Sequence, residues 1–108
     1  MLFKFKSQAT ADLIMLEADA RRLLKIMLGH DPVKGVLTWQ DMPAVLDKIE
    51  QAVVQEDALR QAAAAGASAE AAQAVSELPA VRLAQRAAPM QQMLRRSLAE
   101  ERDIVWGL

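Results

Sequence analysis

Both ends of this chain have the residue pattern of β-strands, whereas most of the sequence between them has the pattern of α-helices. Residues 2–6 alternate, with Phe3 and Phe5 on one face and two lysines, which suit an edge strand, on the other. Residues 103–107 form a β-branched and aromatic run with strand character. We therefore expect the two ends of the chain to pair in one sheet, with the helices lying on it.

A second strand is predicted close to the first. Residues 12–16 contain the apolar run Leu-Ile-Met-Leu, and residues 7–11 are short and polar enough to form a turn. Residues 2–16 are therefore interpreted as a β-hairpin. The segments 12–16 and 104–106 are apolar on both faces, whereas a strand with one face in water alternates. We expect something to cover the second face of the sheet.

Three helical segments are predicted between the strands. The first covers residues 18–28 and ends at Gly29, because glycine is the usual residue of a left-handed helix cap. The second begins near Met42 after a short turn over residues 38–41, because Pro43 fits only in the first turn of a helix. Local signals therefore bound the first helix and the start of the second.

The third helical segment has the strongest periodicity in the sequence. Its apolar residues recur at helical spacing and are Leu83, Ala87, Met90, Leu94 and Leu98. Pro89 lies inside this segment, and its missing N–H should either bend the helix or divide it in two. The pattern leaves both alternatives open.

The alanine-rich middle of the chain is its least defined part, since residues 61–75 contain nine alanines. If the second helix continued to Gly66 it would be roughly 36 Å long, which exceeds the width of a compact domain of this size. We therefore expect it to end earlier. Within a single domain of residues 1–108, residues 61–78 are interpreted as a weakly anchored helical extension, a loose helical hairpin or a partly disordered linker.

Together these patterns predict an α+β fold. A small antiparallel sheet, made of the N-terminal hairpin and the C-terminal strand, packs under about three helices. The 108 residues of the chain are enough for one domain with a substantial core.

The residue types needed for most catalytic and metal sites are scarce. The sequence has no cysteine and one histidine, His30, in the turn after the first predicted helix. This composition excludes cysteine zinc sites, thiol nucleophiles and paired-histidine metal motifs. Several carboxylates occupy positions typical of a solvated helix face, including Asp47, Glu50, Glu56 and Asp57. We expect no catalytic residue, cofactor or metal, and no enzymatic activity.

Charge and hydropathy bear on location and partners. The net charge of −1 gives no overall attraction to nucleic acid or to a membrane surface. No apolar run approaches the ~18 residues of a membrane span, and residues 1–6 lack the pattern of a signal peptide. We expect a cytoplasmic protein without a membrane partner.

The apolar strands supply the first candidates for binding. Residues that could form an interface between protein chains are Leu13, Met15, Val105 and Trp106. Trp106 has a second interpretation, because a tryptophan on a short terminal strand also commonly belongs to the core.

The basic residues of the third helix supply the second candidates. Arg82, Arg86 and Arg96 lie along one side of this helix. They could bind an anion or nucleic acid, or they could form a solvated face in which Arg96 pairs with Glu100. Because no aromatic residue lies between the arginines and the net charge is negative, we do not expect nucleic acid to be the main partner.

Four separated segments of the sequence resemble one known family. They are the opening Met-Leu-Phe-Lys-Phe-Lys-Ser with residues 12–16, residues 38–43, residues 85–96 and residues 105–107. In this order they resemble a small bacterial family called domain of unknown function 1840. The resemblance covers nearly the whole chain apart from the alanine-rich middle. It implies a short, stand-alone cytoplasmic bacterial protein, and it implies no activity, cofactor or catalytic residue.

These features favour a non-enzymatic protein–protein interaction or structural domain. Its expected partner is an unknown protein or a second copy of the chain, which would make a homo-oligomer such as a dimer. The alternative is weak binding of nucleic acid or another anion through the arginine-lined helix face.

Overall fold

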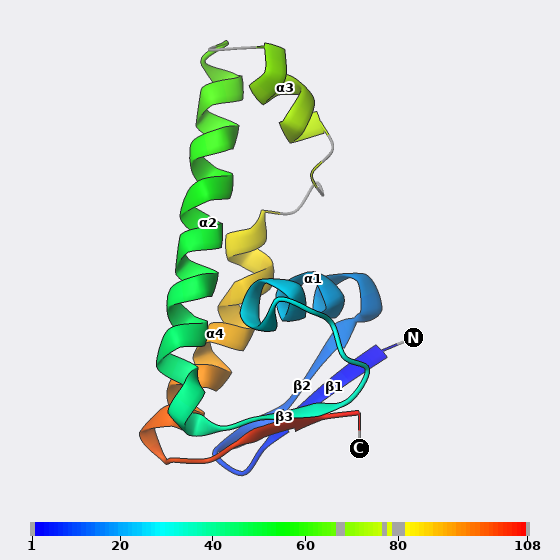
Figure 1. Cartoon of the computed structure of the whole chain (residues 1–108), viewed down its shortest axis with the longest axis vertical. Coiled ribbons are helices and arrows are strands. Elements are labelled where there is room, and N and C mark those ends of the chain that lie inside the picture. Colours follow the sequence, from blue (N-terminus) through cyan, green and yellow to red (C-terminus); the bar gives the residue numbers. More distant parts are fainter. Residues whose placement is uncertain (1, 67–68, 77, 79–81, 108) are drawn as a thin grey trace.

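A computed structural model describes residues 2–66, 69–76, 78 and 82–107 of the chain. The described elements follow one another in the order β1 (Leu2–Ser7), β2 (Thr10–Leu16), α1 (Glu17–Leu28), β3 (Gly35–Leu37), the short 3-10 helix η1 (Trp39–Asp41), α2 (Met42–Ala64), α3 (Ala69–Ser76), α4 (Leu83–Ala99) and β4 (Ile104–Trp106). Figure 1 shows how the helices and the sheet are arranged. The predicted α+β class is confirmed.

The sheet joins the two ends of the chain, as the sequence predicts. Its four strands are antiparallel in the order β2-β1-β4-β3, and Phe5 of β1 lies opposite Trp106 of β4. Strand β3 was not expected, because its sequence Gly-Val-Leu lacks the β-branched and aromatic run that predicts β4. The lysines of β1 do not lie on an edge strand, since β1 lies between β2 and β4.

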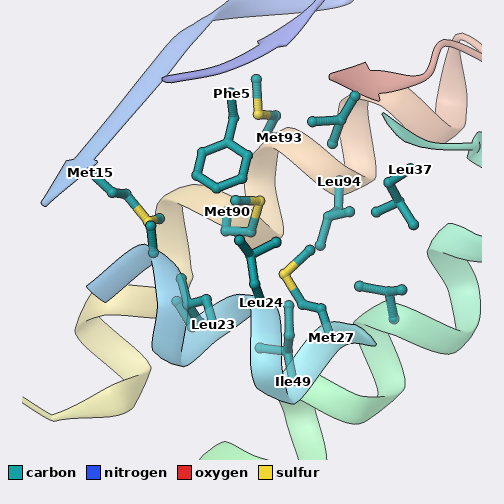
Figure 2. Close-up of a cluster of buried hydrophobic side chains, with 14 of the residues drawn as sticks. Phe5, Met15, Leu23, Leu24, Met27, Leu37, Ile49, Met90, Met93 and Leu94 are labelled. Carbon is teal, nitrogen blue, oxygen red and sulfur yellow. The ribbon is translucent and has the colours of Figure 1, made fainter. Parts of the chain in front are cut away.

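The core lies between the sheet and the helices that cover one of its faces (Figure 1). The centroids of the Phe5 and Trp106 rings are 5.7 Å apart. The indole Nε1 of Trp106 donates a hydrogen bond to the Pro32 carbonyl at 3.1 Å. Figure 2 shows Phe5 pointing from the sheet toward Met90 of α4, with Leu24 of α1 beyond it. The two terminal strands and the helices α1, α2 and α4 therefore share one apolar core.

The helix boundaries predicted from local signals are confirmed. Gly29 caps α1 with a φ of 83°, and its N–H donates to the Lys25 carbonyl at 2.9 Å. A 3-10 turn over residues 39–41 precedes α2, which begins at Met42 with Pro43 in its first turn.

Helix α2 ends two residues before Gly66, as expected, but it is still nearly as long as the helix that was judged too long for a compact domain. It continues for 23 residues to Ala64, and its second half projects beyond the sheet, where α3 packs beside it (Figure 1). The Cα radius of gyration is 15.0 Å, compared with about 13 Å for a compact domain of this length. In the described part of residues 61–78 the chain forms a helical hairpin, and residues 67, 68 and 77 lie outside the described residues.

Helix α4 stays one element from Leu83 to Ala99 although Pro89 lies inside it. Division at the proline is therefore excluded. Because Pro89 has no N–H, the carbonyl of Gln85 does not receive the usual hydrogen bond from the residue four positions later.

The C-terminus of α4 has an unusual residue in its cap. The N–H of Glu101 donates to the Leu98 carbonyl at 3.1 Å, and that of Arg102 donates to the Ser97 carbonyl at 2.8 Å. These two bonds form a Schellman motif, whose left-handed position normally holds glycine. Here Glu101 occupies that position with a φ of 55°, so the backbone of this turn is strained.

A buried carboxylate links three of the helices. Glu56 of α2 was expected on a solvated helix face, but it is only 6% exposed. One carboxylate oxygen accepts a hydrogen bond from the Arg22 guanidinium of α1 at 2.5 Å, and the other accepts one from the Leu83 N–H at the start of α4 at 2.6 Å. Glu56 therefore ties α1 and the first turn of α4 to α2.

The charge state of Glu56 couples this contact to pH. Burial alone would raise the pKa of the carboxyl, but the hydrogen bonds from Leu83 and Arg22 and the Arg22 charge outweigh burial and lower the pKa from its ordinary value of 4.5. The folded state therefore binds this proton less tightly than the unfolded state. The ionised carboxylate stabilises the fold above pH 4.5, and this contribution is lost as the pH falls through the lower pKa of the folded state.

We expect Glu56→Gln to lower the free energy of unfolding by about 2 kcal/mol at neutral pH, because it removes the charge that Arg22 faces. The difference from the wild type should shrink in acid, where the native carboxyl is protonated as well. Urea denaturation followed by circular dichroism measures both effects. Glu50→Gln on the same helix is the control, since Glu50 is exposed and should cost less than about 0.5 kcal/mol. Equal losses for the two variants would contradict the role of Glu56.

Glu101→Gly should raise the free energy of unfolding by about 0.5–1 kcal/mol, because glycine adopts the left-handed conformation without a steric penalty. Glu101→Ala keeps the penalty and serves as the matched control, so it should gain less than the glycine variant. Thermal unfolding of the three proteins compares them. A glycine variant no more stable than the alanine variant would show that the turn is not strained.

Candidate functional site

The face of the sheet that points away from the helices carries large apolar side chains. We call it the open face, and its residues are Leu2, Lys4, Lys6, Asp12, Ile14, Leu16, Val36 and Val105. Leu2, Ile14, Leu16 and Val36 are each 56–61% exposed. Because large apolar side chains on one sheet face normally contact other apolar groups, this face has the character of an interaction surface.

Cross-strand pairing gathers these side chains into two apolar groups. At one end of the open face Leu2 lies opposite Leu16, with Ile14 next along β2, and at the other end Val36 lies opposite Val105. Residues opposite each other in an antiparallel pair project from the same face and touch. The exposed apolar side chains therefore lie in contact across neighbouring strands and are not scattered singly over the face.

Two lysines cross the middle of the open face. Lys4 lies opposite Ile14 and Lys6 lies opposite Val105. The Lys4 ammonium is 3.6 Å from an Asp12 carboxylate oxygen, which balances its charge. The aliphatic part of a lysine side chain can cover apolar surface while the ammonium group stays in water.

The interface residues expected from the sequence lie mostly on the other face. Met15 and Trp106 are buried under the helices, at 8% and 2% exposure, and Leu13 is half-buried on the same side. Of the four predicted residues, only Val105 belongs to the open face. The interpretation of Trp106 as a core residue is confirmed.

The prediction of which β2 residues are exposed was wrong for a simple geometric reason. Phe3 lies opposite Met15 and Phe5 lies opposite Leu13, so the two phenylalanines determine which residues of β2 face the core. In an unbroken apolar run, a shift of one residue exchanges the two faces. The exposed apolar residues of β2 are Ile14 and Leu16 instead.

The three candidate arginines, Arg86 and Arg96 of α4 and Arg82 directly before it, are exposed, but they do not form one free basic row. The Nε of Arg86 is 3.6 Å from an Asp19 carboxylate oxygen of α1. The expected pair of Arg96 with Glu100 is not formed, and Arg96 makes no ion pair with any residue that the structure describes. Arg82 is exposed directly before the first turn of α4.

A groove runs between the outer edge of β2 and α4, and we call it the β2–α4 groove. It contains two cavities of about 200 Å³ and 260 Å³. Leu13 and Pro89 line both of them, so the cavities follow each other along β2. Asp19 and Arg86 lie in the smaller cavity, and Asp12 and Arg96 lie in the larger.

A third cavity, of about 510 Å³, lies where the β1–β2 turn meets η1 and the α4–β4 turn. Its charged residues are of both signs: Lys6, Glu101, Arg102 and Asp103. Asp103 also has a structural role, because its carboxylate accepts a hydrogen bond from the Trp39 backbone N–H at 3.0 Å. This mixture does not indicate one reaction or one ligand.

His30 lies in an exposed turn, as predicted, and its Nδ1 is 3.2 Å from the Leu28 carbonyl oxygen. Among the described residues there is no group of three or more histidine, cysteine, aspartate or glutamate side chains that could hold a metal ion. None of the helices in the described part of the chain combines the length and the apolar character that crossing a membrane requires.

Comparison with known proteins identifies the family. A search of curated proteins and a search of solved structures each gave no match. The sequence model described as "Domain of unknown function (DUF1840)" matches residues 1–106, which is nearly the whole chain and confirms the resemblance of the four separated segments. The chain therefore belongs to the DUF1840 family.

Proposed function

We propose that this chain is a non-enzymatic protein–protein interaction domain that associates with a second copy of itself through the open face of its sheet. The observation that carries the proposal is the exposure of Leu2, Ile14, Leu16 and Val36 on that one face. Each such side chain contributes about 1 kcal/mol to the free energy of association when its exposed apolar surface is removed from water. A second copy supplies the same surface, as a two-fold interface requires.

The charged side chains on the open face are compatible with an interface between the sheets of two copies. Lys4 already has Asp12 as its partner at 3.6 Å, so this ammonium group does not need a new counter-charge in the dimer. Both apolar groups lie beside the lysines and can pack against the partner, because the long lysine side chains can turn their ammonium groups toward water. We also propose a cytoplasmic location, with which a sequence without cysteine is compatible.

Weak binding of nucleic acid or another anion through Arg82, Arg86 and Arg96 is a second candidate. The exposure of Arg96 and its lack of an ion pair in the described structure favour it. Against it, Asp19 lies beside Arg86 at 3.6 Å and reduces the positive potential in the middle of the row. A phosphate backbone is bound by several uncompensated cations together, so we favour the protein partner.

We expect the purified chain at micromolar concentration to have twice the 11.9 kDa mass of one copy, and Ile14→Lys to restore the single-copy mass. A buried lysine in the interface would oppose association. Light scattering coupled to size exclusion measures the mass, and circular dichroism checks that the variant is folded.

Val54→Lys is the matched control for this experiment. Val54 lies on α2 and is 56% exposed, as is Ile14, but it is not on the open face. The control should remain a dimer. A wild-type mass of one copy, or equal dissociation of both variants, would contradict the proposal.

A further inference from the structure

The outer edge of β2 is available to another extended chain. In the sheet order β2-β1-β4-β3, β2 has a neighbour on one side only. Natural edge strands are commonly short or carry proline or lysine, which discourages pairing with another strand. The opposite edge strand, β3, has three residues, whereas β2 has seven and contains neither proline nor lysine.

The β2–α4 groove gives this edge a second wall. An added strand would place alternate side chains toward α4, about 7 Å apart. The two cavities along β2, of about 200 Å³ and 260 Å³, are large enough to receive such side chains. Leu13 and Pro89 separate the cavities and present apolar surface between them. The groove thus combines a free backbone edge with two positions for side chains.

The charges in the groove favour an acidic side chain at one of these positions. In the smaller cavity, a carboxylate oxygen of Asp19 is 3.6 Å from the Nε of Arg86. A carboxylate oxygen of Asp12 is 3.6 Å from the ammonium nitrogen of Lys4 on the neighbouring strand. Arg96 lines the larger cavity and has no ion pair with any residue in the described part of the chain. One positive charge is therefore left uncompensated in the groove. A carboxylate is the group that an arginine binds most directly.

We propose that the β2–α4 groove binds an extended segment of a partner protein, which adds to the sheet beside β2 and places a carboxylate against Arg96. Backbone hydrogen bonds to the edge of β2 provide affinity, and the two cavities and Arg96 select the side chains. This binding uses the edge of the sheet, so it does not depend on self-association through the open face.

A selection from a phage-displayed library of randomised peptides, each about ten residues long, tests the proposal on the full chain. Enriched peptides should carry an acidic residue, and their binding should shift the amide NMR signals of residues 10–16. Arg96→Glu should weaken the binding of a synthesised peptide by about tenfold or more. Arg95→Glu makes the same charge change at an exposed position outside both cavities, so it should alter affinity by less than about twofold.

A second form of the peptide tests the added strand itself. Two versions of the peptide are made, each methylated on the backbone nitrogens of every second residue. One version, or phase, starts at the first residue and the other at the second. The phase that blocks the N–H groups facing β2 should weaken binding by about tenfold, and the other phase should not.

Two results would overturn the proposal. The first is that no peptide is enriched, and the second is that the enriched peptides shift signals elsewhere than in β2.

Discussion

The buried carboxylate of Glu56 is the contact on which the arrangement of the helices depends. It accepts hydrogen bonds from Arg22 of α1 and from the first N–H of α4, and it belongs to α2 itself. These three helices therefore form one layer, and α1 and α4 contact the sheet from the same side (Figure 1). A carboxylate this far from water is tolerated only because its partners satisfy it. The other face of the sheet receives no helix in the described structure, which leaves its apolar residues exposed.

The elements that could be predicted from the sequence are those bounded by local signals. Gly29 ends α1 and Pro43 places the start of α2 because each restricts its own backbone. Strand β3 and the role of Glu56 could not be predicted in this way, since each depends on residues far away in the sequence. Glu56 meets Leu83, which is 27 residues further along the chain. A helical pattern around Glu56 contains no signal of such a partner.

The candidate site shows the same division between local and long-range information. That both faces of the hairpin are apolar could be read from residues 12–16, but which face is open depends on the pairing of Phe5 with Leu13 and with Trp106. Once the aromatic rings occupy the core side, Ile14 and Leu16 must point outward. The free edge of β2 and the β2–α4 groove beside it exist because β2 is the outermost strand on that side of the sheet. The open face and the edge are therefore two surfaces with different physical bases, one in apolar burial and the other in backbone hydrogen bonding.

The contact proposed between the open faces of two copies can be tested without changing any residue. An isotope-filtered NMR experiment on a mixture of labelled and unlabelled chains detects contacts between copies directly. We expect intermolecular contacts from the methyl groups of Ile14, Leu16 and Val36. Intermolecular contacts that come only from helix residues such as Val54, or the absence of any intermolecular contact at micromolar to millimolar concentration, would contradict it.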